Sequence, residues 1–381
     1  MDRNSFSILI TGDLVINQEY WVSNLDQGLI DLFHQSDLNI VNLEAPVTKS
    51  SSRILKTGPH LKSEKQSTLD VLKQLEVDVV TLANNHVLDY DEQGVMDTLS
   101  FCTDNNIQTV GAGKNLEESS KTLYIHSTEG SIAIVNFAEN EWSSATDESA
   151  GANPMDIIEN AKQIQEAKQK ADFVFVIVHG GHEYYNLPSP RTQKQYRFYA
   201  EQGADIVIGH HTHCISGHET HQGVPIYYSL GNFLFTKTSS YEDWYLGLIL
   251  EVEIKNSKLI HKLHPVKQEK EGFELILLDG VEKEEVLNRI SGYNVIIKDS
   301  EKLKIEWSIY MESMYAAYLN YWTPLSFIKN RYIKGLFNKL GIRLLNEKGM
   351  TYYLNLIRCE AHNDMSKEVI QKYLKNKKSQ T

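Results

Sequence analysis

Side chains that bind divalent metals recur in this sequence at one kind of place, directly after a short apolar run. Five runs read as buried strands followed by such side chains: FSILITGD, LNIVNLE, VDVVTLANNH, FVFVIVHGG and ADIVIGHH. The candidate ligands at their ends are Asp13, Glu44, Asn85, His179, His211 and His213. Strand ends from distant parts of a chain converge at one edge of an α/β sheet, so these residues predict one shared site.

The segment GADIVIGHHTH holds the densest group of histidines. His211 and His213 lie two residues apart, and in an extended segment such residues point to the same face. The pair can therefore bind one ion or two adjacent ions. Any single histidine or aspartate of the set, taken alone, fits an interior histidine or a turn cap better. The joint occurrence after five strands favours metal binding.

The residue types indicate the class of metal. Imidazole, carboxylate and amide oxygen together suit manganese, iron, zinc or cobalt. Six candidates exceed the four ligands of a tetrahedral zinc, so we expect two divalent ions with one bridging carboxylate. Glu44 is the preferred bridge, because the amide of Asn42 on the same face is neutral and offsets less of the repulsion between ions.

Further polar residues follow or flank the expected ligands. His86 follows Asn85 directly and is a candidate proton donor to a leaving group, although a histidine there can also serve to orient other ligands. The candidates for substrate contact or support of the ligands are Asn42, His182, Glu183, His210 and Asn232.

The elements around these residues alternate between strand and helix patterns over about the first 240 residues. Helices are predicted over 66–75, 91–105, 156–171 and 191–202, and PIYYSLGNF (225–233) is predicted as one further strand. Two hairpins are predicted, over 121–137 with a turn at Glu129–Gly130 and over 244–266 with a turn at 255–257. This order predicts a layered α/β fold with parallel strand pairs.

Composition narrows the class of protein. The 38 basic and 50 acidic residues leave a net charge of −12, which argues against a general nucleic-acid binder. Three widely separated cysteines indicate no disulfide framework. The sequence shows neither a signal peptide pattern nor an apolar stretch long enough to span a membrane, so we expect a cytoplasmic protein.

The character of the chain changes after the second hairpin. We expect one domain over 1–270 and a mainly helical extension over 271–381. Within the extension, 325–346 combines basic residues with apolar residues at near-helical spacing. Such a helix can lie on the inner face of an anionic membrane or pack its apolar side on the main domain, and the latter is favoured.

The ordered motifs GD, NLE, LANNHVLDYDEQGVMDTL, GAGKN, HGGHEY, GADIVIGHHTH and YYSLGNF resemble those of the poly-γ-glutamate capsule synthesis (CapA) family. That family lies in the calcineurin-like metallophosphoesterase superfamily. The resemblance covers about residues 7 to 255. It implies a four-layer α/β/β/α sandwich with a two-metal centre at the strand ends.

The resemblance also implies roles for individual residues. Asp13 matches the first-motif aspartate, Glu44 the bridging carboxylate, Asn85 the asparagine ligand and His86 the catalytic histidine. His179, His211 and His213 match the remaining histidine ligands. Two positions depart from the superfamily pattern, since Asp13 is followed by Leu14 and Val15 without a histidine, and the second motif is Asn-Leu-Glu.

The function implied is that of a metal-dependent hydrolase with a small-molecule or polymer substrate. It would act on a phosphoester or a γ-glutamyl amide in the synthesis of a capsule polymer such as poly-γ-glutamate. The alternative is a non-hydrolytic accessory or scaffold protein of capsule assembly, with a structural or single metal ion.

Overall fold

The computed structural model describes residues 5–323, 328, 330–340 and 346–378, and it divides into two compact units. The first unit is Met1–Lys304 and the second is Ile305–Thr381. Helix α7 (Gly280–Lys298) packs against β11 and β15 of the first unit. The first unit therefore continues past the boundary expected at residue 270, and only the helices after it form a separate body.

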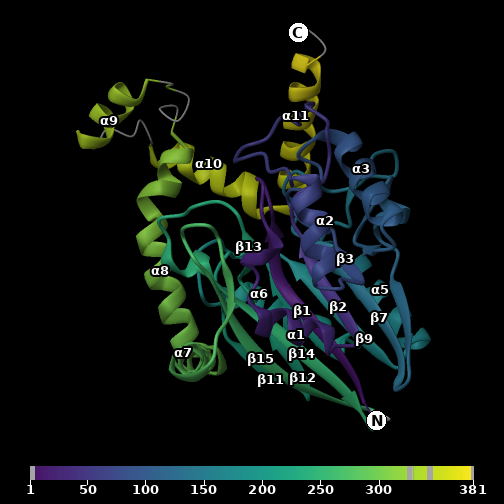
Figure 1. Ribbon diagram of the computed structural model, residues 1–381. Helices are drawn as coiled ribbons and strands as arrows, with labels where there is room; N and C mark the ends of the chain where they lie inside the picture. Colours follow the sequence, from purple (N-terminus) through teal and green to yellow (C-terminus); the bar gives the residue numbers. More distant parts are fainter. Residues whose placement is uncertain (1–4, 324–327, 329, 341–345, 379–381) are drawn as a thin grey trace. The chain divides into compact units, whose positions relative to one another are not determined.

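Two sheets form the centre of the first unit (Figure 1). Sheet one has the order β16 (Leu275–Leu277), β15 (Lys258–Gln268), β14 (Leu246–Lys255), β1 (Phe6–Val15), β2 (Leu38–Leu43), β3 (Val79–Thr81) and β4 (Gln108–Val110), with β13 (Asn232–Phe235) also paired to β1. Sheet two has the order β11 (His218–His221), β12 (Val224–Tyr227), β10 (Ile206–His210), β9 (Phe173–His179), β7 (Gly130–Ala138) and β6 (Leu123–Ser127). Strands β5 (Ala112–Gly113) and β8 (Gly151–Ala152) form a separate small pair.

The apolar runs form central strands because both faces of each sheet are covered. In β1, Ile8 and Ile10 pack between the two sheets, whereas Leu9 packs on the opposite face toward the helices. Successive side chains of a strand point to opposite faces, so a strand covered on both sides must be apolar at nearly every position. This is why the sequence shows continuous apolar runs instead of alternation.

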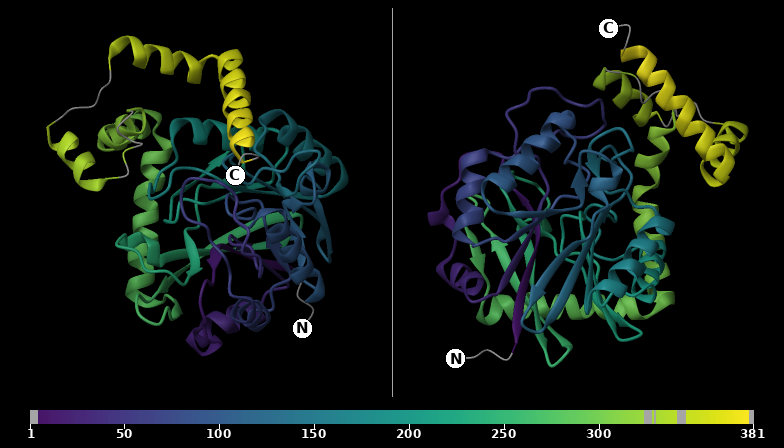
Figure 2. Two further views of the ribbon diagram at one scale, coloured as in Figure 1. Left: turned by 90° about the horizontal axis from the view of Figure 1, so that it is seen from above. Right: turned by 90° about the vertical axis from the view of Figure 1, so that its right-hand side faces the viewer.

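Helices cover the outer faces of both sheets (Figure 2). Helices α1 (Gln27–His34), α2 (Lys65–Gln74) and α3 (Asp91–Asp104) pack on sheet one, and α5 (Ile157–Lys170) and α6 (Pro190–Glu201) pack on sheet two. The expected four-layer α/β/β/α order is confirmed. The four predicted helices agree with the structure within one residue at each end. At α6, the N-cap Ser189 accepts from Thr192 N, and Pro190 occupies the first turn.

Both predicted hairpins are present, as β6–β7 and β14–β15. The prediction of a single strand over 225–233 is wrong. The chain leaves sheet two after β12, and Gly231 takes a φ of +68°, which glycine tolerates best. The chain then joins sheet one as β13, where Asn232 lies opposite Asp13. The break therefore carries a polar side chain from one sheet to the other.

Gly12 is a second position where only glycine fits, because β1 and β13 approach closely there. A Cβ atom at Gly12 would lie 1.9 Å from the carbonyl oxygen of Gly231, which already accepts from Asp13 N. We expect Gly12→Ala to lower the free energy of unfolding by about 1–3 kcal/mol or more through this overlap.

Urea unfolding of Gly12→Ala beside Gly292→Ala would test this. Gly292 lies in α7 with nothing within 4 Å of its added Cβ, so alanine there should stabilise the protein by roughly 0.5–1 kcal/mol. Equal midpoints for Gly12→Ala and the unmodified chain would contradict the close-approach argument.

The second unit is helical as far as it is described, in agreement with the expected extension. It holds the greater part of α8 (Ser300–Tyr321), followed by α9 (Arg331–Lys339), α10 (Glu347–Arg358) and α11 (Glu360–Lys378). Of the predicted amphipathic segment 325–346, residues 325–327, 329 and 341–345 lie outside the described residues. None of the helices in the described ranges is both long and apolar enough to cross a membrane.

Candidate metal centre

The six predicted ligands all lie together, at the ends of strands from both sheets. Asp13 lies in β1, Glu44 follows β2, and Asn85 follows β3. His179 ends β9, and the loop after β10 carries His211 and His213. Each of the six side chains is buried, with at most 6% of any residue exposed. The convergence at strand ends predicted from the sequence is therefore present in the fold.

One group of donor atoms surrounds His179. Its Nε2 atom lies 3.0 Å from Asn85 Oδ1, 3.1 Å from His211 Nδ1 and 3.7 Å from Glu44 Oε1. Ligands around a tetrahedral ion with metal–nitrogen distances of about 2.0–2.1 Å lie roughly 3.3–3.4 Å apart. The observed spacing brackets this value, so these four side chains fit a bound divalent ion.

A second group shares Glu44 with the first and also includes Asp13 and His213. His213 Nε2 lies 3.8 Å from Glu44 Oε1, and His213 Nδ1 lies 3.5 Å from Asp13 Oδ2. Asn232 Oδ1 lies 2.9 Å from the same Nδ1 atom. Asn232 Nδ2 donates to Trp244 O at 3.0 Å, which fixes the direction of the amide oxygen. Glu44 belongs to both groups.

The electrostatics of the centre indicate a missing positive charge. Neither carboxylate oxygen of Glu44 has a hydrogen-bond partner among the described residues, although the side chain is fully buried. Burial and the neighbouring Asp13 raise the pKa of Glu44 well above its ordinary value. A buried carboxylate without donors is costly, and a divalent cation would supply the missing partner.

The histidines respond to the same carboxylates. Burial alone would lower the pKa of His213, but Glu44 and Asp13 raise it to about 9. Burial and the neighbouring His213 lower the pKa of His211 to about 3. Burial likewise opposes ionisation of Asp13, yet His213 and His179 hold its pKa below the ordinary range. The centre therefore attracts positive charge on its Asp13 and Glu44 side and offers neutral imidazole nitrogens on the other.

His86 lies beside the centre in a turn that follows β3. Asn84 holds this turn, since its Oδ1 accepts from His86 N and its Nδ2 donates to Leu43 O, each at 3.0 Å. His86 Nδ1 lies 2.7 Å from Asp89 Oδ2 and 3.2 Å from the ammonium of Lys56. Burial lowers the pKa of His86, and Asp89 opposes that shift. A proton shared between Nδ1 and Asp89 leaves Nε2 available to a substrate.

Lys56 and Asp89 are site residues that the sequence analysis missed. Lys56 pairs with Asp89, and only 2% of the lysine side chain and none of the aspartate side chain is exposed. Asp89 also accepts from Leu61 N at 2.7 Å. The three-residue spacing of His86 and Asp89 within one turn was a usable signal. Lys56 had none, because it lies in an irregular segment between β2 and α2.

Glu141 and Ser143 were also missed. Glu141 Oε2 accepts from Asn85 Nδ2 at 3.4 Å, and its Oε1 lies 3.8 Å from His211 Nε2. Ser143 Oγ donates to Asn85 O at 2.7 Å. Both residues follow β7, which is a sixth strand ending at this edge. The hairpin pattern of 121–137 gives no sign that residues after the strand reach the ligands.

Of the residues predicted to support the ligands, some contact a ligand and others do not. Asn42 and Asn232 reach the ligands directly, since Asn42 Nδ2 donates to Asp13 Oδ1 at 2.7 Å and lies 3.3 Å from His179 Nδ1. His210 instead turns to β1, where its Nε2 donates to Thr11 O at 2.7 Å. Glu183 is exposed and acts on Glu44 through its charge.

His182, the remaining supporting residue, lines a small hollow next to Tyr185 and Thr212. Two aromatic rings lie near His213, which belongs to the second group of ligands. The Trp244 ring lies 4.8 Å from that of His213, and the Tyr184 ring lies 6.1 Å from it. Tyr184 is 43% exposed, whereas His213 beside it is buried.

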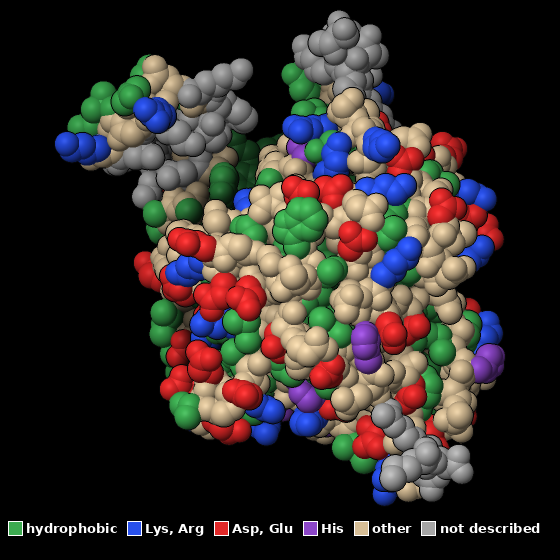
Figure 3. Space-filling view, viewed as in Figure 1, with side chains coloured by type: hydrophobic (Ala, Val, Ile, Leu, Met, Phe, Trp, Pro, Cys, Tyr) green, Lys and Arg blue, Asp and Glu red, His purple; other side chains and the backbone are tan. Residues whose placement is uncertain are grey.

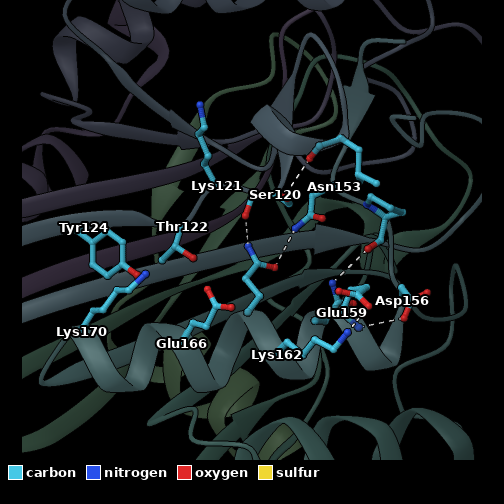
Figure 4. Close-up of a pocket in the computed structure, with 14 residues that line it drawn as sticks. Ser120, Lys121, Thr122, Tyr124, Asn153, Asp156, Glu159, Lys162, Glu166 and Lys170 are labelled. Carbon is cyan, nitrogen blue, oxygen red and sulfur yellow. Dashed lines mark hydrogen bonds and ion pairs between the residues drawn. The ribbon is translucent and has the colours of Figure 1, made fainter. Parts of the chain in front are cut away.

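A separate hollow of about 600 Å³ lies between β6 and α5 (Figure 4). Its lining mixes both charges, with Lys121, Lys162 and Lys170 beside Asp156, Glu159 and Glu166. None of the predicted ligands lines it. The hollow is therefore distinct from the metal-ligand groups.

Comparison with known proteins agrees with the motifs. The family model described as bacterial capsule synthesis protein PGA_cap matches residues 7–237. The PGA biosynthesis protein CapA of Bacillus subtilis is 34% identical over 224 residues, covering 58% of this chain and 59% of that protein. The capsule biosynthesis protein CapA of Bacillus anthracis is 33% identical over 250 residues, covering 61% of each.

A more distant relative is a probable polyglutamine synthesis accessory protein of Mycobacterium tuberculosis. It is 26% identical over 211 residues, covering 52% of this chain and 55% of that protein. The chain thus spans about three fifths of the length of its Bacillus relatives. The family match extends from β1 through β13 and includes every residue of the two ligand groups. The chain belongs to the bacterial capsule synthesis protein family.

Proposed function

We propose that this protein is a metal-dependent hydrolase with two divalent ions, drawn from manganese, iron or zinc, bound at the strand ends. The observation that carries the proposal is Glu44, a fully buried carboxylate that belongs to both ligand groups and has no hydrogen-bond partner among the described residues. Two ions held by one bridging carboxylate provide Lewis acidity and a hydrolytic nucleophile at neutral pH.

The chain's own residues would prepare the site for that chemistry. The side-chain amide of Asn42 donates to Oδ1 of Asp13 and holds that carboxylate in place. The Oδ1 atom of Asn232 lies within hydrogen-bond distance of Nδ1 of His213 and holds that ring. Such outer contacts fix ligand orientation and imidazole tautomer. The enclosing walls bury every ligand and keep the local dielectric low, which strengthens each electrostatic contact to a substrate.

We assign His86 the role of proton donor to the leaving group: with Asp89 accepting from Nδ1–H, the protonated ring would give its Nε2 proton to the leaving atom and become neutral. Replacing His86 by alanine should lower the hydrolysis rate by about 10²–10⁴-fold, because a positioned proton donor contributes that much. Metal content should remain unchanged, since His86 belongs to neither ligand group. Rate measurements paired with elemental analysis would check both expectations. Loss of metal together with rate would reassign His86 to ligand support.

The substrate class follows from the family. The Bacillus subtilis relative is named a PGA biosynthesis protein, and the match includes both ligand groups. We therefore propose a phosphoester or a γ-glutamyl amide, in a small molecule or a polymer, as the bond cleaved during synthesis of a capsule or other surface polymer.

A non-hydrolytic accessory role is the second candidate. It is favoured by the position two residues after Asp13, where Val15 packs with Phe235 and Trp244 and offers no ligand atom. The second ligand group therefore lacks the histidine that the superfamily pattern places there. The Mycobacterium tuberculosis relative is named an accessory protein. A protein of this kind would hold one ion for structural purposes.

The decisive experiment measures metal content and hydrolysis of a chromogenic phosphodiester and a γ-glutamyl anilide. We expect two ions in the unmodified protein and hydrolysis of one substrate. His179→Ala should lose at least one ion and about a hundredfold or more in rate, because it removes a ligand. The control His126→Ala replaces an exposed histidine of β6 and should match the unmodified protein. One ion and no hydrolysis would favour the accessory role.

A further inference from the structure

The second unit differs from the first in charge. Residues 305–381 hold 12 lysines and arginines against six acids, whereas the preceding 304 residues hold 26 against 44. The chain therefore joins a strongly acidic unit to a basic one. Acidic side chains spread over the visible face of the first unit in Figure 3. A basic segment in an acidic protein favours an anionic partner.

The second unit is also rich in aromatic residues with a polar edge. It holds 8 of the 20 tyrosines and 2 of the 5 tryptophans in about one fifth of the chain. Tyrosine and tryptophan concentrate where an apolar phase meets water, because one end of each side chain is apolar and the other hydrogen-bonds.

The helices of this unit leave their apolar side chains uncovered. From residue 305 onward, no apolar side chain in the described ranges is buried. Large apolar residues are exposed on every helix, including Ile309 on α8, Leu354 on α10, and Val369 and Ile370 on α11. A helix gains little stability from propensity alone, so these faces require a covering surface.

Helix α9 shows the arrangement most clearly. Ile333, Leu336 and Phe337, with Leu340 directly after the helix, follow the spacing of one helix face, and three of the four are 45–61% exposed. Arg331 and Lys339 fall on the remaining face and are exposed. Helix α9 is thus amphipathic, with one apolar and one basic face along its length. This is the pattern of a helix that lies in a lipid–water interface.

We propose that the second unit binds the surface of an anionic lipid bilayer, with the apolar stripe of α9 inserted among the acyl chains. Its basic residues would contact anionic headgroups, and its tyrosines and tryptophans would lie at headgroup level. Pairing of two second units is disfavoured, because each would bring a like-charged basic surface to the other. The tyrosines and tryptophans, with one apolar and one polar end, favour a lipid–water interface over the acidic first unit. The inference is independent of the proposed hydrolysis.

Co-sedimentation of the full chain with lipid vesicles tests the proposal. Vesicles of phosphatidylcholine alone should leave the protein in the supernatant, whereas an equimolar mixture with phosphatidylglycerol should pellet it. Raising the salt concentration should release it, because headgroup attraction is screened. The double variant Arg331→Gln/Lys339→Gln should partition about thirtyfold less, since each basic residue near an anionic surface contributes roughly fivefold.

A second pair of variants separates insertion from charge. Ile333→Ser/Leu336→Ser should lower partitioning by at least about tenfold. The matched control Ile157→Ser/Ile158→Ser removes two similarly exposed apolar residues from α5 of the first unit and should bind as the unmodified protein does. Circular dichroism would show that each variant keeps its helix content.

Three results would overturn the proposal. The unmodified protein could stay in the supernatant with both vesicle types, as expected if the second unit docks on its own acidic first unit. The variants could pellet as efficiently as the unmodified protein. Light scattering could show a dimer that Ile333→Ser/Leu336→Ser dissociates, without vesicle binding, which would identify a second copy as the occupant.

Discussion

Replacing Glu44 by glutamine should abolish two-metal binding and hydrolysis while leaving the fold intact. Glutamine keeps the shape of the side chain but removes the negative charge that both ligand groups share. Without it, two cations would face each other with only Asp13 to offset them, so the stoichiometry should fall to one ion or none. We expect the rate to fall by about 10³-fold or more, since metal ions supply several kcal/mol of transition-state stabilisation.

The same substitution should stabilise the metal-free protein. Glu44 is fully buried without a hydrogen-bond donor, and its pKa is raised in the folded state by burial and by Asp13. A raised folded-state pKa means that stability is present below the unfolded value of 4.5 and is lost as pH rises above it. Glutamine does not titrate, so the variant's advantage should grow from pH 4.5 upward and reach roughly 1–3 kcal/mol.

Thermal unfolding in chelator across this pH range, for the unmodified chain and Glu44→Gln, would measure the effect. Added metal should reverse the order, because only the unmodified protein gains binding energy from two ions. Equal stability of the two metal-free proteins at every pH would contradict the argument that the buried Glu44 carboxylate lacks a stabilising partner.

Replacing Lys56 by methionine should cause the largest loss of stability among single substitutions near the site. Lys56 and Asp89 form an ion pair with both side chains almost fully buried. Removing one member of such a pair leaves the other charge uncompensated and costs about 3–5 kcal/mol. The His86 ring should also lose its fixed position, since Asp89 orients it through Nδ1.

Urea unfolding of Lys56→Met, Asp89→Asn and the double variant would separate pairing from burial. The double variant should lose much less than the sum of the single losses, because no charge is left unpaired. The control Lys162→Met removes a lysine from an exposed pair with Glu159 on α5 and should change little. Additive losses would mean that Lys56 and Asp89 contribute independently.

Much of the fold was accessible from the sequence because its central strands are covered on both faces. Such strands must be apolar throughout, which makes the runs ending at Asp13 and His179 easy to recognise. Amphipathic helices with capping residues, such as α6 after Ser189, were equally clear. The sequence did not reveal that the chain passes from one sheet to the other at Gly231, because a glycine inside an apolar run does not show which sheet the next residues join.

The ligands could be predicted because strand-end convergence is a general property of α/β sheets. Partners that reach the site from irregular segments escaped prediction. Lys56 lies in a segment without periodic pattern, and its burial depends on Asp89, 33 residues later. Glu141 follows a strand, but the hairpin pattern of that strand does not show where the chain goes after it. Local sequence shows which residues end a strand, whereas contacts from loops depend on the completed fold.

The crossing of the chain at Gly231 has a consequence for the order of folding during synthesis. Sheet one is built from two pieces of the sequence, β1–β4 and β13–β16, and the strands of sheet two lie between them. Strand β1 must wait for β14, whose residues emerge from the ribosome more than 200 positions later, before its second edge is paired. Such long-range pairing folds slowly and leaves an open strand edge in the nascent chain. The nascent protein should therefore depend on chaperones until β14 is released.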